Sequence, residues 1–531
     1  MRNTVIERFI MKKNIGIDFG TTNTVIYTRD SKGNCKTIGG KNIRSAIYFF
    51  SKDEFCIGKE ALDRGFDATH SMALVTDFKP RIMEKIDIVA EDGTEFRLKG
   101  EAVARLFLAK VLSEYIEPRF KKLFGSVEMT SSDKTVITVP AKFDSERKSR
   151  IKKAAIKAMY TNVGIAFEPT AAAVAALDTD FSDETIAVYD FGGGTFDVSV
   201  IEKNTDGHYF SVDEDGDANL GGNTITDAIV ENFYLPLLAE QGICLCMDPD
   251  DMEFDECAMT EDEYVYNMRT LRKHVESMKE AFSDNIANYI SQIQISQDGQ
   301  DSTYPVSIDK QLFEKIIEPY VQTTVDITRR IIDRIKKQKK YVRKIIMAGG
   351  SSQLDLAKRL LTEEFEGDGI EVILSDSVFD LISKGALLLA ERQKLIRVEE
   401  KTATQFGIGV RTGIGIQKFE MLIDAGVSLP ISGQKMFTID HNIQSIGRVT
   451  IPCYEKDVRN YPKALTEQDE GIRHINTYHI SIEKNINITD IVVMFTIESD
   501  GTLNLSANLI DQCGNKIQGF NTEINSDSDT E

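Results

Sequence analysis

The stretch VYDFGGGTFDVSV, residues 188–200, and the stretch IGIDFGTTNT, residues 15–24, share one pattern. In both, a short apolar run leads into Asp, Phe and Gly, and Thr follows shortly after. A β-branched run closed by glycine predicts a strand that ends in a tight turn. The repeat predicts two related lobes, each with an Asp-x-Gly turn. Chance similarity is the alternative, because Asp and Gly are common in turns.

The region around these two turns alternates strand and helix patterns as far as residue 392. KTVITVPA (134–141) and VRKIIMAGGSS (342–352) are further apolar runs punctuated by proline or glycine. This rhythm is typical of α/β folds, in which backbone donors at the carboxyl ends of strands bind ligands. We therefore predict an α/β domain over residues 11–392, preceded by an extension over residues 1–10.

Beyond the α/β region the pattern changes. Residues 393–403, QKLIRVEEKTA, are mostly polar and are interpreted as an interdomain linker. Runs such as FEMLI and DIVVMFTI then alternate with Gly, Asn and Asp turns, which predicts an antiparallel β domain over residues 404–520. The last residues, 521–531, are predicted to form an acidic, solvated tail.

The composition excludes several classes of partner. The 531 residues carry a net charge of −21, which would repel a nucleic-acid backbone, so no nucleic-acid partner is expected. No apolar run reaches the length of about 18 residues that a membrane-spanning helix needs, so no membrane partner is expected. The seven cysteines are an odd number without repeated metal-ligand spacing. This pattern favours free thiols in a reducing compartment, and we expect a cytoplasmic protein.

Three glycine-containing turns are candidates for binding phosphate. Glycine lets the backbone N–H groups approach a phosphate closely, and neighbouring hydroxyls add further donors. No GxxxxGK[ST] motif occurs, which excludes a P-loop. The predicted phosphate-binding residues are Gly20, Thr21 and Thr22 in the first turn, Gly192, Gly193 and Gly194 in the second, and Gly349, Gly350 and Ser351 in the third.

Three carboxylates complete the candidate chemistry. Asp18 and Asp190 end the two similar strands, so we expect them to face each other across a magnesium ion, held through its water shell. Glu168 precedes Pro169, and a proline at a helix start would direct this carboxylate toward the same cleft, where it could orient an attacking water. The alternative for Glu168 is a helix-capping acid on the surface.

Six segments together resemble the heat shock protein 70 (DnaK-type) chaperone family, within the actin and sugar-kinase ATPase superfamily. The resemblance implies a multidomain α/β plus β architecture. A duplicated, actin-like (ribonuclease H-like) ATPase domain would precede an antiparallel β-sandwich that binds peptide. The matching segments, in the family's order, are IGIDFGTTNT (15–24), TVITVPAKF (135–143), FEPTAAAVAAL (167–177), VYDFGGGTFDVSV (188–200), NLGGNTI (219–225) and IIMAGGSS (345–352).

The resemblance also implies roles for individual residues. Lys79 in TDFKPRIM resembles the catalytic lysine of the family, with a surface lysine as the alternative because Pro80 replaces an expected arginine. Thr195 would contact phosphate, and Asp197 and Glu168 would position the water. Asn23, Gly221 and Gly222 lie in nucleotide-binding motifs, and Glu276, Lys279 and Ser283 match a helix that embraces adenosine.

The function implied is an ATP-dependent chaperone. It would use ATP/ADP and Mg²⁺ and bind unfolded or extended polypeptides, with a J-domain co-chaperone and a nucleotide-exchange factor as further partners. Gln353 replaces an adenine-stacking arginine and Asn223 replaces an acid, so weaker nucleotide binding is expected. The sequence ends at Glu531, so we expect no helical lid and rapid peptide release.

Other functions remain as alternatives. One is a nucleotide-sensing adaptor with slow or no hydrolysis that binds one dedicated protein. Another is an actin-like, filament-forming ATPase, and a sugar kinase is disfavoured because the β domain would go unused. A carboxylate-rich stretch, residues 247–263, follows Cys244 and Cys246. It lacks the ligand order of an EF-hand, so a solvated surface segment is favoured over a divalent-metal site.

Overall fold

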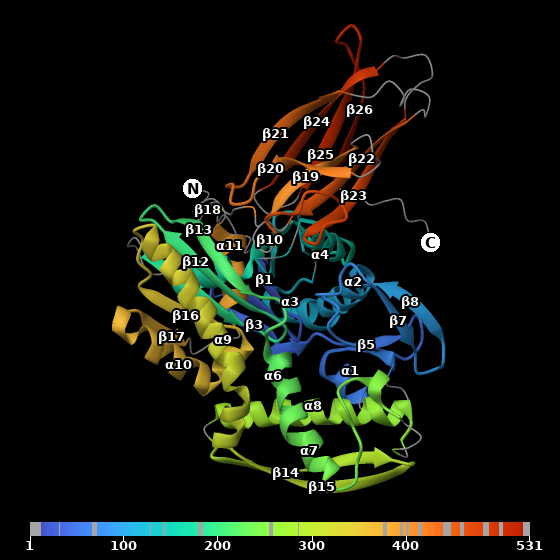
Figure 1. The fold of residues 1–531 in the computed structure, drawn as a ribbon, viewed down its shortest axis with the longest axis vertical. Coiled ribbons are helices and arrows are strands. Elements are labelled where there is room, and N and C mark those ends of the chain that lie inside the picture. The colour runs from blue at the N-terminus through green and yellow to red at the C-terminus, as the bar shows by residue number, and fades with distance from the viewer. Residues whose placement is uncertain are drawn as a thin grey trace, which may run out of the picture. The chain divides into compact units, whose positions relative to one another are not determined.

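In the computed structural model, the chain forms two compact units (Figure 1). Unit 1 comprises Met1–Pro140 and Lys153–Arg397, and unit 2 comprises Ala141–Lys152 and Val398–Glu531. The structure describes all residues except 1–11, 31, 66–71, 128, 142, 144, 179–183, 254–256, 258, 285, 375–379, 393–396, 400, 401, 403, 412–416, 439–447, 457–460, 482–487, 499–502 and 524–531.

Unit 1 contains two five-stranded arrangements of the same order. The first is β10-β9-β1-β2-β3, in which β1 runs parallel to β9 and antiparallel to β2. The second is β17-β16-β11-β12-β13, in which β11 runs parallel to β16 and antiparallel to β12. The strands of the first are β1 (Ile15–Phe19), β2 (Asn23–Arg29), β3 (Cys35–Arg44), β9 (Thr135–Val139) and β10 (Val163–Phe167). Those of the second are β11 (Glu184–Phe191), β12 (Phe196–Lys203), β13 (His208–Asp217), β16 (Lys344–Ala348) and β17 (Glu371–Leu374).

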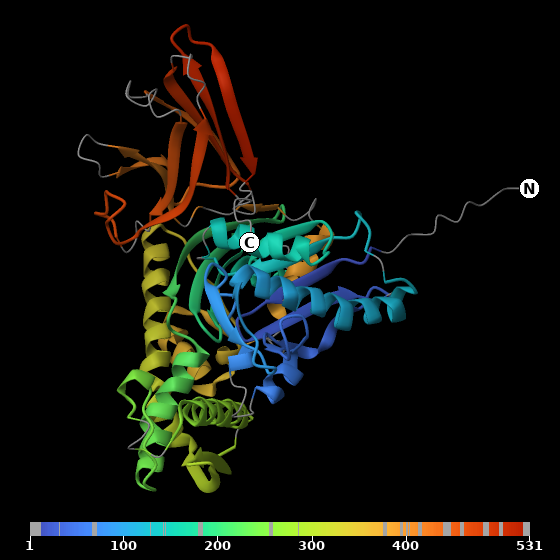
Figure 2. The ribbon, with the colours of Figure 1, turned by 90° about the vertical axis from the view of Figure 1, so that its right-hand side faces the viewer.

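The central strands β1 and β11 are mostly buried, and helices cover them. Helix α9 (Lys310–Lys337) packs along β12 and β13 (Figure 2). Helix α11 (Leu381–Arg392) lies on β1 and on α5 (Glu168–Ala176). A Cβ atom on Gly16 or on Gly385 would collide with backbone across these contacts, so both positions require glycine for close packing. This packing fixes the positions of β1, which contains Asp18, and of α5, which begins at Glu168.

A second part of unit 1 is built on helix α8 (Glu261–Ser283), which packs against the hairpin β14–β15 (Figure 1). Thr260 caps α8 through a reciprocal capping box with Glu263. The two strands are β14 (Asn288–Gln297) and β15 (Gln300–Asp309).

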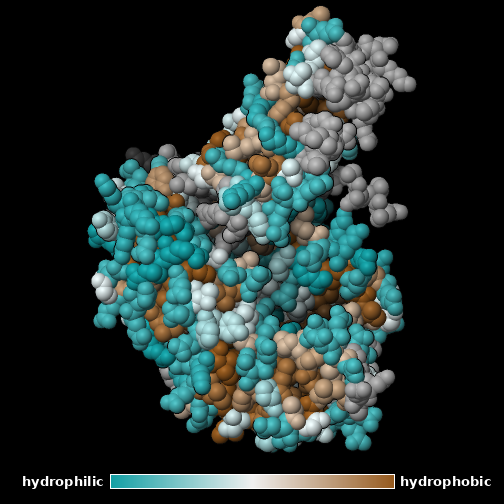
Figure 3. Space-filling model, in the orientation of Figure 1, coloured by the Kyte–Doolittle hydropathy of each residue, from teal (hydrophilic) through white to brown (hydrophobic). Residues whose placement is uncertain are grey.

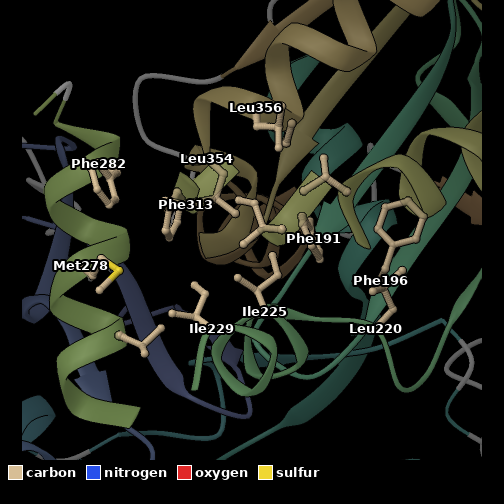
Figure 4. Packing of buried hydrophobic residues seen from close by; sticks show 14 of the residues in the cluster. Phe191, Phe196, Leu220, Ile225, Ile229, Met278, Phe282, Phe313, Leu354 and Leu356 are labelled. Carbon is tan, nitrogen blue, oxygen red and sulfur yellow. The ribbon is translucent and has the colours of Figure 1, made fainter. Parts of the chain in front are cut away.

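Apolar side chains from several elements form one core between α8, α9 and α6 (Gly222–Ile229). In Figure 4, Ile225 and Ile229 of α6, Met278 and Phe282 of α8, and Phe313 of α9 point toward one another. All five are at most 2% exposed. Burial of this apolar surface orders the part of α8 on which a ligand site is predicted.

Shorter elements complete unit 1. Its strands are β4 (Ile47–Phe49), β5 (Phe55–Ile57), β6 (Leu74–Val75), β7 (Lys85–Val89) and β8 (Glu95–Lys99). Its helices are α1 (Gly58–Arg64), α2 (Gly100–Val111), α3 (Glu117–Phe124), α7 (Leu235–Ala239) and α10 (Asp355–Phe365). Short π- or 3₁₀-helical turns are η2 (Leu112–Ile116), η3 (Val230–Tyr234), η4 (Pro249–Asp251), η5 (Gly350–Gln353) and η6 (Glu366–Asp368). Helix α4 (Ser145–Lys157) and strand β18 (Arg397–Glu399) lie at the boundaries between the units.

Unit 2 contains two four-stranded antiparallel sheets, β20-β19-β22-β23 and β21-β24-β25-β26, and one apolar core. In β24 and β21, buried or half-buried residues alternate with more exposed ones, as expected for strands with one face in the core. The strands are β19 (Gln405–Arg411), β20 (Gln417–Ile423), β21 (Ile431–Thr438), β22 (Arg448–Lys456), β23 (Ile472–Ser481), β24 (Ile488–Ile497), β25 (Leu503–Asp511) and β26 (Lys516–Glu523).

Three boundaries differ from the sequence-based expectations. The predicted tail begins too early, because β26 continues to Glu523 and Asn521 pairs with Ser506. Backbone hydrogen bonds hold these polar residues on an edge strand regardless of side chain. Arg397–Glu399, inside the predicted linker, form β18. Ala141–Lys152 group with unit 2, which chain order alone could not indicate.

Two expected segments lie outside the described residues. They are the N-terminal extension 1–10 and the first four residues of the linker, 393–396. Among the described residues, no helix is long and apolar enough to cross a membrane. The face in Figure 3 is mainly hydrophilic, with apolar side chains in separate groups.

Candidate functional site

The two Asp-x-Gly turns have the same local geometry. In the β1–β2 turn, the N–H of Gly20 donates to the carbonyl oxygen of Asn23 at 3.1 Å. In the β11–β12 turn, the N–H of Gly192 donates to the carbonyl oxygen of Thr195, also at 3.1 Å. An aspartate stands two residues before each of these glycines. The sequence repeat is therefore a repeat of strand, turn and strand in the structure.

The structure brings the two turns into contact. A Cβ atom added to Gly193 would collide with the hydroxyl oxygen of Thr22, and one added to Gly194 would lie 3.8 Å from the hydroxyl of Thr21. The turns pack closely at this point, so position 193 has no room for a side chain. Their backbone N–H groups and threonine hydroxyls offer donors from both sides, which is the donor set that phosphate oxygens accept.

Another glycine segment, residues 221–223, packs against the β11–β12 turn. The N–H groups of Gly222 and Asn223 donate to the carbonyls of Gly192 and Gly193 at 2.9 and 2.7 Å. A Cβ on Gly221 would collide with that same turn. Since Asn223 contacts the turn through its backbone, the replacement of the expected acid leaves this contact intact.

The third predicted turn lies beside Asp190. Gly349 has a φ of +82°, and a Cβ there would lie against the carboxylate of Asp190. The hydroxyl of Ser351 donates to the carbonyl of Gly192 at 2.9 Å. Gly350, the residue between them, is exposed. The turn after β16 thus packs against the turn after β11.

Lys79 and Glu168 form a buried ion pair. The Nζ of Lys79 lies 2.7 Å from Oε1 of Glu168, and the two side chains are 3% and 12% exposed. The same ammonium lies 5.9 Å from the centre of the Phe19 ring. Glu168 is the first residue of α5, and Pro169 follows it at a position where its missing N–H costs nothing. The alternatives of a surface lysine and a surface helix cap are therefore wrong for these two residues.

Carboxylates crowd around this pair. The pKa of Asp18 is raised to about 7, first by burial and then by the charge of Glu168, while Lys79 and a hydrogen bond from Thr138 oppose the shift. Burial also raises the pKa of Asp190 well above its usual range, with added repulsion from Glu168, Asp18 and Asp197. In the hairpin register, Asp197 stands directly opposite Asp190.

Such a cluster fits a hydrated divalent cation. Buried carboxylates that raise one another's pKa are stabilised when positive charge comes close. Among the residues that the structure describes, no three His, Cys, Asp or Glu side chains are placed to coordinate a metal ion together. A magnesium ion near Asp18 and Asp190 would therefore keep water ligands, as this cation prefers.

The predicted adenosine-binding residues lie on one helix, α8. The Nζ of Lys279 donates to Oε1 of Glu276 at 2.6 Å, to the Thr226 hydroxyl at 2.8 Å and to the Gly222 carbonyl at 3.1 Å. Ser283 donates to the carbonyl of Lys279 at 2.9 Å. Glu276 and Lys279 are therefore held against α6.

A small cavity lies at the carboxyl end of α8. Ser283, Phe282, Phe313 and Leu354 line it together with the N-terminal residues of α9 and α10. Figure 4 shows Phe282, Phe313, Leu354 and Leu356 around this part of the core. This cavity has room for about one water molecule, which is much less than a nucleotide base needs.

Comparison with known proteins agrees with this architecture. A family model described as Hsp70 protein matches residues 14–531. The chain belongs to the Hsp70 family. The matched residues include both Asp-x-Gly turns and all the elements of unit 2.

The curated relatives of this Hsp70 family member include proteins named chaperone protein DnaK. The one from Thermosipho africanus is 26% identical over 514 residues, covering 93% of this chain and 77% of the relative. The one from Mycoplasma mobile is 26% identical over 532 residues, covering 98% and 80%. The one from Thermotoga neapolitana is 25% identical over 508 residues, covering 93% and 78%. At this identity the chain is a divergent member of the Hsp70 family.

Sequence reasoning missed three residues that support the site in this Hsp70 family member. The Thr138 hydroxyl donates to Asp18 at 3.2 Å. The Ser45 hydroxyl donates to the Gly20 carbonyl at 2.8 Å, and Thr226 donates to Glu276 at 3.0 Å. Thr138 could have been predicted, because it lies near the end of an apolar run that can form a strand beside β1. In the parallel register of β1 and β9 it is the partner of Asp18. Ser45 and Thr226 had none.

Asn23, which is predicted to contact the nucleotide, also takes part in the first turn. Its side-chain oxygen accepts a hydrogen bond from Arg44 at 3.2 Å, and its carbonyl oxygen closes the first turn. These bonds make Asn23 a residue that shapes the turn.

Proposed function

We propose that this Hsp70 family member is an ATP-dependent chaperone in which ATP binding and hydrolysis are coupled to the binding of extended apolar polypeptides. The observation that carries the ATPase part is the contact between the two Asp-x-Gly turns, Gly193 against Thr22, with the Lys79–Glu168 pair beside them. Phosphoryl transfer needs donors around phosphate, positive charge and an oriented water, and these residue types supply all of them.

In this proposal each group has a defined task. The turn residues Thr21, Thr22 and Gly192–Thr195 bind phosphate oxygens, and Lys79 places its ammonium beside them. Asp18 and Asp190 hold the water shell of Mg²⁺, which supplies positive charge to the phosphates when bound. Glu168 and Asp197 accept hydrogen bonds from the attacking water.

The base and ribose would lie toward α8. Glu276 and Lys279, held at the amino end of α6 by Thr226 and Gly222, would contact the ribose, and the base would lie near Ser283 on the same helix. Gln353 stands where an adenine-stacking arginine is expected, so we propose weaker nucleotide binding than in typical relatives.

We further propose that unit 1 is a duplicated, actin-like ATPase domain. The shared strand order and directions of its two sheets, and the matched hydrogen bonds of the two turns, support a duplication. The copies are not identical, because Asp197 stands opposite Asp190 in one hairpin and Val25 stands opposite Asp18 in the other. This difference agrees with the proposal that Asp197 of the second hairpin positions the water, since Val25 has the equivalent place in the first hairpin.

Unit 2 is proposed as a β-sandwich that binds extended peptide. Its two antiparallel sheets share an apolar core, and an extended peptide can bind such a domain through backbone hydrogen bonds and side-chain pockets. Residues 412–416 and 439–447 of this unit lie outside the described residues. A J-domain co-chaperone and a nucleotide-exchange factor are the proposed protein partners, and the cytoplasm is the proposed location.

The test is the ATP turnover rate of the purified protein with and without an extended apolar peptide. Coupling of two sites through one conformational equilibrium predicts that ATP and peptide each lower the other's affinity by the same factor. It also predicts that peptide changes the turnover rate. A rate that stays constant across a wide range of peptide concentrations would refute the coupling.

A second candidate is a nucleotide-sensing adaptor with slow or no hydrolysis. The presence of Gln353 in place of the expected stacking arginine favours the adaptor function, because it would weaken binding of the adenine base. Single-turnover measurements distinguish the two, since an adaptor would bind ATP and leave it intact over hours. An actin-like filament former would instead scatter light when ATP is added.

A further inference from the structure

One short segment of unit 1 is rich in sulfur. Residues 244–259, CLCMDPDDMEFDECAM, contain three cysteines and three methionines, in a chain with only seven cysteines and 15 methionines. Cysteine and methionine are soft ligands, and a concentration of both in one segment is typical of sites for soft metal ions. The phosphate site described above uses none of these residues.

The segment is also strongly acidic. From residue 241 to residue 268 there is no Lys, Arg or His, whereas nine Asp or Glu residues occur. A cation near this segment is therefore favoured by electrostatic attraction as well as by ligand softness.

Asp248, Asp250, Asp251 and Glu253 are exposed, as expected of a solvated surface segment, but two methionines of the segment are packed into the core. Met252 is 7% exposed and Met259 is 5% exposed, and both belong to the large apolar core of unit 1. The hydroxyl of Tyr264, on α8, donates to the carbonyl oxygen of Cys246 at 2.9 Å. Cys246 is thus held in place by a structured helix.

Two sulfur atoms lie close together at this point. The Sγ of Cys246 is 3.9 Å from the Sδ of Met252 and 2.8 Å from the carbonyl oxygen of Asp248. Two metal–sulfur bonds of about 2.3 Å that span this separation would meet at about 115°, an angle close to trigonal. Burial raises the pKa of the Cys246 thiol.

We propose that Cys246 and Met252 bind one monovalent soft metal ion, with Cu(I) as the cation that fits best. When the metal–thiolate bond forms, the thiol proton of Cys246 passes to solvent, and no electron is transferred. Cys244, two residues earlier, or the Asp248 carbonyl is available as a third ligand.

A divalent ion fits this place less well. Structural zinc sites use four protein ligands, and calcium takes six to eight oxygens. Within the described ranges, no group of three His, Cys, Asp or Glu side chains is arranged to hold a metal ion. A thiolate and a thioether satisfy Cu(I), which accepts few, soft ligands.

The test is an anaerobic competition between the fully reduced protein and a chromophoric Cu(I) chelator, with Cu(I) as the metal added. We expect the wild-type protein to withdraw one equivalent of Cu(I). Cys246→Ser should abolish this, and Met252→Leu, which keeps the volume of the buried side chain, should weaken it at least tenfold. Cys513→Ser and Met436→Leu are matched controls, because both original side chains are exposed in unit 2, and they should bind as the wild type does.

Three outcomes would overturn the proposal. One is that the wild type withdraws no Cu(I) from the chelator. Another is that Cys246→Ser still binds one equivalent, and the third is that Cys257→Ser removes binding while Cys246→Ser does not. Circular dichroism melting of each variant shows whether it is folded, and Met252→Leu keeps the test decisive if Cys246→Ser does not fold. No readout depends on ATP hydrolysis, so the proposal stands or fails independently of the proposed function.

Discussion

The ammonium nitrogen of Lys79 lies 2.7 Å from the carboxylate of Glu168, although 89 residues separate them in the chain. The pair is nearly inaccessible to solvent, and Asp18 and Asp190 interact with both of its members. A lysine in such surroundings provides positive charge where four carboxylates would otherwise repel one another. The pair therefore links the stability of the fold to the chemistry proposed for the site.

Lys79→Ala should reduce ATP hydrolysis by about a hundredfold, because it removes positive charge from the developing transition state. ATP binding should change only a few-fold, since the turn residues and Mg²⁺ remain. Single-turnover hydrolysis and equilibrium binding of ATP measure the two effects separately. Lys52→Ala is the matched control, because Lys52 is exposed in a turn and its removal should change neither. Normal hydrolysis by Lys79→Ala would show that the lysine is wrongly assigned.

The same substitution should lower the free energy of unfolding. Removing one member of a buried ion pair leaves the other charge without compensation, at a cost of about 3 kcal/mol. Adding Glu168→Gln to Lys79→Ala should recover much of this loss without recovering hydrolysis. Urea unfolding of the wild type and of the single and double variants measures it. If the double variant is the least stable, the two residues are not coupled as described.

Thr195→Ala should also slow hydrolysis by about a hundredfold while ATP still binds. The reason is that the proposal gives the Thr195 hydroxyl a phosphate contact, whereas the turn is closed by its backbone carbonyl, which alanine keeps. The kcat of the variant measures the effect. Thr303→Ala, an exposed threonine of β15, serves as the control. Equal kcat values for the two variants would exclude a role for Thr195.

Much of unit 1 could be predicted from sequence because its signals are local. Apolar runs closed by glycine became β1, β11 and β16, and Pro169 correctly indicated the start of a helix at Glu168. A strand pattern and a turn residue each depend on a few neighbouring residues, so one sequence contains enough information to find them.

Other features depend on distant segments and left no local signal. The depth at which Lys79 is buried and the acid it pairs with depend on how α5 packs against α11, where Gly385 meets Ala171. The burial of Met252 and Met259 could not be predicted, because nine Asp or Glu residues in the same stretch indicate a solvated segment. The pairing of Asn521 in β26 was missed because an edge strand tolerates polar side chains.

Lys279→Ala should weaken ATP binding and leave kcat nearly unchanged. Its ammonium bridges Glu276, Thr226 and the carbonyl of Gly222, so its loss disorders the proposed adenosine contacts, while the N–H of Gly222 keeps its bond to the carbonyl of Gly192. We expect KM to rise about tenfold, the effect of losing a charge-assisted hydrogen bond. Steady-state kinetics separate KM from kcat. Lys273→Ala, an exposed position on the same helix, is the control, and a fall in kcat without a change in KM would contradict the assignment.

Asp215 should give a pH-dependent contribution to stability. Burial alone would raise its pKa, but hydrogen bonds from Arg330, Arg334 and the N–H of Gly216 outweigh this and lower the pKa to about 2. A carboxylate with a lowered pKa stabilises the fold above its unfolded-state pKa of about 4, and this is lost as the pH falls toward 2.

Asp215→Asn should therefore cost about 1 kcal/mol at pH 7, a modest value because the arginines are partly exposed. The difference from the wild type should stay constant between about pH 5 and pH 8 and shrink below about pH 4. Urea unfolding across this range measures it. A difference that grows as the pH falls would have the wrong sign for these ion pairs.

We propose that one nucleotide is held between the turn of Thr22 and the turn of Gly193. Calorimetric titration of ATP in the presence of Mg²⁺ tests this most directly. We predict one ATP per chain and a loss of affinity of at least tenfold in Gly193→Ala, whose added methyl group would collide with Thr22 and displace the two turns. Gly367→Ala, where a Cβ meets no atom within 4 Å, should bind as the wild type does. If Gly193→Ala binds ATP as tightly as Gly367→Ala, the nucleotide does not lie between the two turns.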